Sequence, residues 1–224
     1  GNTIPFIARY RKELHGAMDD TSLRTLEERL QYLRGLEERR EAVKKSIDEQ
    51  GKLTDELAAA IDSAKTLAEV EDLYRPYKQK RRTRATMAKE KGLEPLAALL
   101  FAQERDCLRP EEAARDFVDP EKGVETVEDA LQGASDIIAE QISDDAAIRK
   151  SLRALISRQG QLVSRAATED DSVYRLYYDF TQSVARLQGH QVLAINRGEK
   201  EGILKVSITL DREQALPLLR RAVV

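Results

Sequence analysis

The chain has 224 residues, of which 41% are hydrophobic and 34% charged, so it is long enough and apolar enough to bury a core. Aromatic residues make up only 5% and Trp is absent, which favours helices packed through aliphatic side chains. A single cysteine, Cys107, excludes an internal disulfide and a cysteine-rich zinc site. No apolar run approaches the roughly 18 residues of a membrane span, so we expect a cytoplasmic protein with no membrane partner.

The net charge of -3 is unevenly distributed along the chain. Residues 1–92 carry 20 basic and 17 acidic side chains, residues 93–145 carry 4 and 15, and residues 146–224 carry 13 and 8. This asymmetry bears on partners rather than on fold. From the elements described below, we predict a helical subdomain over 1–92 with a long amphipathic helix and a basic loop, a helical subdomain over 93–190 that is acidic in its first half, and a small β-hairpin with the start of a following helix over 191–224. Because the chain opens on Gly1 rather than Met, we expect a fragment of a larger multidomain protein.

A long amphipathic helix is predicted between Asp20 and Gly51. Apolar residues recur there at spacings of three and four or multiples of them, with charged residues between them. The apolar positions are Leu23, Leu26, Leu30, Leu33, Val43 and Ile47. The polar run 19–22 supplies acceptors for the first helical amides, and Gly51 suits the end of the helix.

Several shorter helices follow, each with its own start signal. Thr54 and Thr66 are predicted N-caps of two helices over 54–64 and 66–75, a pair that resembles a helix-turn-helix. The second helix carries Glu69 and two further acids, which phosphates would repel, so helix packing explains the pair better than groove reading. Later helices are predicted to begin at Thr83, Pro95, Pro110 and Thr126, and another to run from 148 to Gly160.

The C-terminal third changes its pattern. Val173, Tyr177, Phe180, Val184 and Leu187 predict one more helix, which ends at Gly189. Val192–Asn196 and Ile203–Leu210 are β-rich runs joined by a glycine-containing loop, which predicts a hairpin. The expected fold class is therefore mainly α, a multi-helical bundle with helix-turn-helix-like pairs and a small β-hairpin near the C-terminus.

The stretch from 75 to 84 is the most informative for function. It holds six cations in ten residues, and no acid occurs from Leu73 through Lys89. Cations can hold phosphates by charge while an aromatic ring stacks on a base, so the stretch is a candidate nucleic-acid site. Alternatively, its cations form a solvated loop or neutralise the acidic segment 93–145. The candidate nucleic-acid-binding residues are Arg75, Tyr77, Lys78, Lys80, Arg81, Arg82 and Arg84.

Catalytic and metal-binding patterns are poorly represented. His15 and His190 lie far apart in the sequence, and neither belongs to a set with metal-ligand spacing. Cys107 has Asp106 beside it, which raises rather than lowers a thiol pKa. Glycine-rich phosphate loops and nucleophile motifs are absent from the sequence. We expect a non-catalytic chain with no metal and no cofactor.

Five runs resemble the signature segments of bacterial Tex proteins, in the expected order and over almost the whole chain. They are residues 3–13 (TIPFIARYRKE), 49–54 (EQGKLT), 71–84 (EDLYRPYKQKRRTR), 92–97 (GLEPLA) and 193–202 (LAINRGEKEG). Two local departures are His15 to Met18, where the family pattern has Thr-Gly-Gly-Leu, and Arg75, where an apolar residue is expected.

This resemblance implies part of a multidomain, nucleic-acid-binding transcription accessory protein, similar in layout to a eukaryotic transcription elongation factor. Such proteins continue with an RNase-H-like domain, helix-hairpin-helix motifs and an S1 domain. The implied partners are RNA or DNA without sequence preference, the transcription machinery and the other domains of the full-length protein. We expect a helical scaffold whose basic loop contacts phosphates. The alternative is a protein-interaction scaffold that docks other Tex domains or the transcription machinery without touching nucleic acid.

Overall fold

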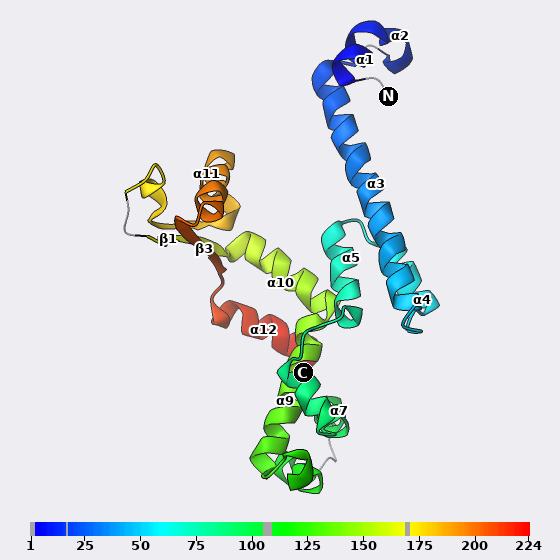
Figure 1. The fold of residues 1–224 in the computed structure, drawn as a ribbon, viewed down its shortest axis with the longest axis vertical. Coiled ribbons are helices and arrows are strands. Elements are labelled where there is room, and N and C mark those ends of the chain that lie inside the picture. Colours follow the sequence, from blue (N-terminus) through cyan, green and yellow to red (C-terminus); the bar gives the residue numbers. More distant parts are fainter. Residues whose placement is uncertain (1–2, 17, 105–108, 169–170) are drawn as a thin grey trace. The chain divides into compact units, whose positions relative to one another are not determined.

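The protein is mainly α-helical in the computed structural model, which describes residues 3–16, 18–104, 109–168 and 171–224 (Figure 1). The chain divides into two compact units, Gly1–Lys78 and Gln79–Val224. The predicted boundaries at residues 92 and 190 both fall inside the second unit. Helices from either side of residue 92 pack against one another there.

The first unit is built around one long helix. Its elements are α1 (Ile4–Tyr10), α2 (Lys12–His15), α3 (Asp20–Asp48), α4 (Asp55–Ser63) and α5 (Leu67–Tyr74), followed by a 3-10 turn over Arg75–Tyr77. The side chains of Asp19, Thr54 and Thr66 each accept a hydrogen bond from the backbone amide three residues later. The predicted helix starts are therefore confirmed, because each cap satisfies an amide that has no partner within its helix.

The core of the first unit lies along the C-terminal half of α3. Leu36, Val43 and Ile47 are buried together with Ile61 of α4 and Val70 of α5. The amphipathic helix is confirmed, but its predicted apolar face is not buried along its whole length. Further toward the N-terminus, the leucines at positions 26, 30 and 33 remain exposed.

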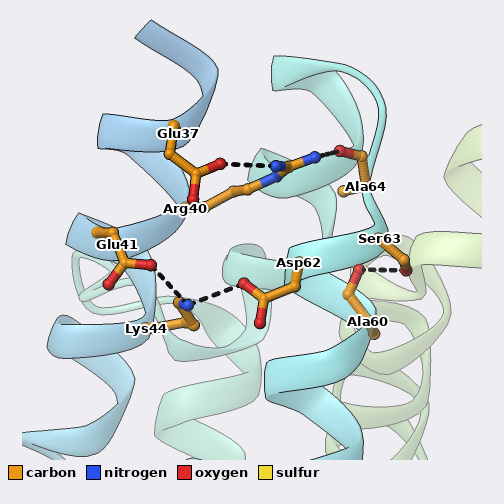
Figure 2. A network of polar contacts seen from close by, with 8 residues as sticks. All are labelled: Glu37, Arg40, Glu41, Lys44, Ala60, Asp62, Ser63 and Ala64. Carbon is orange, nitrogen blue, oxygen red and sulfur yellow. Dashed lines mark hydrogen bonds and ion pairs between the residues drawn. The ribbon is translucent and has the colours of Figure 1, made fainter. Parts of the chain in front are cut away.

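Two charged side chains of α3 bind α4 and the residue that follows it (Figure 2). Arg40 binds the carboxylate of Glu37 at 2.7 Å and the backbone carbonyl of Ala64 at 2.5 Å. Lys44 binds Asp62 at 2.8 Å and Glu41 at 2.6 Å, and these two carboxylates, Asp62 first, raise the pKa of Lys44 to about 12. Lys44 therefore stays charged at any physiological pH.

The helical part of the second unit collects around α9. Its helices are α6 (Arg84–Glu90), α7 (Glu94–Ala102), α8 (Pro110–Ala114), α9 (Val127–Asp144) and α10 (Ala146–Gln159), with 3-10 turns over Arg115–Phe117 and Pro120–Lys122. The helices α6, α7 and α8 all contact α9. The start of α9 is fixed by a capping box in which Thr126 and Asp129 bond to each other's backbone amides.

Small side chains make this second core tight. Ala88, Ala130 and Ala134 are buried beside Leu93 and Ile137. A Cβ placed on Gly133 of α9 would lie 2.3 Å from Cδ1 of Leu93. Glycine and alanine are therefore required where the helices approach most closely.

A three-stranded antiparallel sheet, with two more helices, completes the second unit. Its elements are β1 (Gln161–Ala166), β2 (Asp179–Ser183), α11 (Gly189–Lys200), β3 (Leu204–Thr209) and α12 (Arg212–Val223), with 3-10 turns over Arg175–Tyr177 and Val184–Arg186. The strand order is β2-β1-β3, with Leu162 opposite Gln182 on one side and Ile208 on the other. The mainly α fold with a small antiparallel β element near the C-terminus is confirmed.

Two of the predicted elements in this region are wrong. The strand expected at Val192–Asn196 is part of α11, because Ile195 and Gly198 turn inward at helical spacing and Gly198 lies against Leu204. A short apolar run does not distinguish a strand from a helix, and here the packing decides. The predicted hairpin loop over 196–202 is accordingly the end of α11 and the turn that leads into β3.

The helix expected over 173–187 is also wrong. That segment forms two 3-10 turns flanking β2, whose Phe180 and Gln182 pair with Ser164 and Leu162 of β1. Strand pairing with a segment about 20 residues earlier thus overrides the local helical pattern. Among the described residues, no helix combines the length and the apolar character that crossing a bilayer demands.

Candidate nucleic-acid interface

The basic loop, defined here as residues 75–84, spans the point where the two units meet along the chain. Arg75 and Tyr77 lie in the 3-10 turn near the end of the first unit, and Lys78 is the last residue of that unit. Residues 79–83 have no regular structure, and Thr83 caps α6, whose first residue is Arg84. Each part of the loop is therefore positioned by its own unit.

In the first unit, the aromatic member of the loop is anchored. Tyr77 is half-buried against the core around Ile47 and Ile61, and its backbone carbonyl accepts a hydrogen bond from Gln50 at 3.0 Å. The neighbouring Tyr74 donates to or accepts from Ser46 at 3.0 Å. Part of Tyr77 is thus engaged with the core of its own unit, which reduces the ring area available for stacking on a base.

In the second unit, Lys80 is turned toward acids of α9. Its ammonium group contacts the carboxylates of Asp144 and of Glu140, the latter at 3.4 Å. The Lys80 side chain is 27% exposed and that of Asp144 only 10%. Neutralisation of the acidic segment 93–145, one of the predicted roles of the loop, is therefore performed by Lys80. Other cations of the loop remain exposed.

The remaining cations lie on the surface. Arg82 pairs with Glu90 at 2.8 Å, and both side chains are more than half exposed, so the pair contributes little to stability. Lys78, Arg81 and Arg84 are exposed, and their side chains form no ion pair with any residue that the structure describes. Arg75 is exposed and has an interaction partner. Three cations are thus available to an external anion.

One further basic location was missed by sequence reasoning. Arg165 of β1 lies directly opposite Lys205 of β3, and both are exposed. Like charges in register destabilise a sheet, and here Asp179 on the other neighbouring strand offsets them by pairing with Arg165 at 2.5 Å. No local pattern could have revealed this pair, since β1 itself was not predicted.

The histidines are not joined in a common site. The Nε2 atom of His15 lies 3.2 Å from the carbonyl oxygen of Ile7, a local contact between α2 and α1. His190 is at the start of α11 in the other unit. Within the described residues, no group of three or more His, Cys, Asp or Glu side chains has an arrangement that could hold a metal ion. Cys107 lies outside the described residues.

Comparison with known proteins identifies the family. A family model described as Tex central region-like matches residues 105–222, and one described as Tex-like protein N-terminal domain matches residues 1–48. The chain belongs to the Tex family. The match to residues 105–222 includes the two segments, 173–187 and 192–196, whose secondary structure was predicted wrongly.

The relatives come from bacteria and from animals. Protein YhgF of Escherichia coli is 48% identical over 94% of this chain and 27% of its own length. The transcriptional accessory protein Tex of Neisseria gonorrhoeae is 44% identical over 93% of this chain and 27% of its own length. The human S1 RNA-binding domain-containing protein 1 is 31% identical over 93% of this chain and 22% of its own length. The chain thus spans less than a third of each of these relatives.

Proposed function

We propose that this chain is a non-catalytic part of a longer transcription accessory protein of the Tex family, and that exposed cations of its basic loop bind the phosphates of RNA or DNA. The name of the Neisseria relative supports the link to transcription, and the name of the human relative points to RNA. Both are similar to this chain over more than nine-tenths of its length. The transcription machinery and the other domains of the longer protein are its partners in this proposal.

One observation carries the nucleic-acid part of the proposal. The side chains of Lys78, Arg81 and Arg84 are exposed and have no ionic partner in the described structure, within a run that contains no acid from Leu73 through Lys89. A cation paired with an acid attracts phosphate less, because the acid cancels its charge, whereas a cation without an ionic partner presents its full charge. The expected binding is therefore electrostatic and independent of base sequence.

Lys80 has a different role in this proposal. Its contacts with Glu140 and Asp144 hold the loop to α9, so it positions the loop in the second unit rather than binding phosphate itself. The half-buried Tyr77 likewise holds the turn of the first unit. We therefore assign phosphate contact to Lys78, Arg81 and Arg84, with Arg75 and Arg82 at the margin.

The test is fluorescence anisotropy of the chain with labelled single-stranded RNA and duplex DNA over a salt series. The test variant carries Lys78→Ala, Arg81→Ala and Arg84→Ala. The control carries Lys52→Ala, Lys65→Ala and Lys200→Ala, which removes the same charge from exposed positions elsewhere.

The affinity should fall with salt, and the slope of log K against log salt should drop by about 0.7 for each lost phosphate contact on single strands and about 0.9 on duplex DNA. The control should keep nearly the full slope. Equal loss in both variants would mean that only net charge matters. Absence of binding by the folded wild-type chain at low salt would refute the proposal and favour a role in docking other proteins or domains.

A further inference from the structure

Three leucines on α3 are exposed although their spacing is that of a buried helix face. Leu26, Leu30 and Leu33 have exposed fractions of 54%, 45% and 45%. With Leu23, which is only 5% exposed, they follow one another at intervals of three, four and three residues. This is the spacing of the a and d positions of a helix that packs lengthwise on another helix.

The exposed face is distinct from the face that holds the core of the first unit. The core residues Leu36, Val43 and Ile47 point about a quarter of a turn away from the exposed leucines, at 100° per residue. Within this unit, α1 and α2 lie at one end of α3 and α4 lies toward the other (Figure 1), and α5 also contacts α3. The three leucines precede the core residues of α3 in sequence, and about half of each side chain is left uncovered by the described residues.

The apolar area continues toward the N-terminal end of α3. A surface hollow of about 510 Å³ is lined by Leu26, Met18 and Thr25, among others. Met18 is 45% exposed. A contiguous apolar strip of this kind marks a surface that is normally covered, whereas single exposed leucines do not.

The flanks of the strip carry charges that any occupant must match. If Leu23 and Leu30 occupy heptad position a, then Glu27 and Arg34 occupy position e on one flank of the strip. Arg29 occupies position g on the other flank. A helix that runs antiparallel along the strip would therefore complement it with a cation near Glu27 and a carboxylate near Arg34.

We infer that this strip is the docking site of an amphipathic helix from the same polypeptide, supplied by the part of the longer Tex protein outside these 224 residues. The inference rests on the proposal that the chain is part of such a protein, and the relatives have more than three times its length. The a and d spacing specifies a helix as the occupant, with aliphatic side chains at matching positions.

A second copy of the chain fits the strip less well. In a parallel pair, Arg29 would oppose Arg34 of the other copy, and like charges in these positions repel. In the antiparallel register that brings Glu27 to Arg34, Leu26 would oppose Glu37, which is a charged residue at an a position. A helix of different sequence avoids both conflicts.

The experiment compares the maleimide reactivity of a cysteine at position 30 in two proteins, the 224-residue chain and the full-length protein that contains it. Both carry Cys107→Ser and Leu30→Cys, and Leu33→Cys serves as a second probe. The control is Glu28→Cys, an exposed position at f on the opposite side of α3. Circular dichroism checks that each variant retains its helix content.

We expect modification at position 30 to be at least about tenfold slower in the full-length protein than in the 224-residue chain, because labelling then requires the docked helix to open. The control should react equally in both. Equal rates at position 30 would overturn the inference. Protection that appears in the 224-residue chain and grows with its concentration would also overturn it, in favour of a second copy. Because no nucleic acid is present, either result is independent of phosphate binding by the basic loop.

Discussion

Replacing Lys80 with Ala should separate the structural cation of the basic loop from the cations that bind phosphate. The Lys80 side chain is 27% exposed, and it contacts Asp144, which is 10% exposed, and Glu140. An exposed ion pair contributes up to about 1 kcal/mol, and breaking a fully buried one costs about 3–5 kcal/mol. This partly buried pair lies between these limits, so we expect the variant to lose about 2 kcal/mol of unfolding free energy.

The assay combines urea unfolding, followed by circular dichroism, with anisotropy of labelled RNA at a temperature where every variant is folded. Lys80→Ala should unfold at lower urea and keep the salt slope of RNA binding. The matched variant Arg81→Ala should unfold like wild type and lose about 0.7 of that slope, since its side chain has no ionic partner in the described structure. The reverse pattern, with a stable Lys80→Ala that loses the slope, would refute the assignment of Lys80 to structure.

Two further predictions concern stability. Gly133→Ala should lower the free energy of unfolding by about 1–3 kcal/mol in urea, despite the better helix propensity of Ala, because its Cβ would lie 2.3 Å from the buried Leu93 side chain. The control Gly35→Ala on α3, whose Cβ would have nothing within 4 Å, should raise the free energy of unfolding by up to about 1 kcal/mol. A stabilised Gly133→Ala would contradict this packing. Hydrogen bonds from Ser22, its side chain first and then its backbone, lower the pKa of Asp19 below 3.8, so the stability from this cap is complete above pH 3.8 and is lost as the pH falls through the lower folded value. Acid unfolding of Asp19→Asn, which keeps an acceptor but does not titrate, should lack this component.

Local sequence determined the helices that begin with a side-chain cap, because these start signals act within four residues, but it did not determine α11. Thr54, Thr66 and Thr126 each bond to an amide three positions later, and no distant residue is needed for that contact. The amphipathic pattern between residues 20 and 51 determined α3 in the same way. The cluster of cations at 75–84 could likewise be identified as a charged surface from its composition alone.

Only the tertiary structure decided which residues of these elements are engaged. Lys80 contacts Asp144 across 64 positions of sequence, so composition could not distinguish it from the neighbouring Arg81, which has no ionic partner among the described residues. The pairing of β1 with β3 joins residues 38 to 48 positions apart, and it is this partner that makes 161–166 a strand. Likewise, the pattern that predicts α3 does not show that its apolar side divides into one buried and one exposed face. Backbone caps depend on neighbours in sequence, whereas ion pairs, strand pairing and burial depend on neighbours in space.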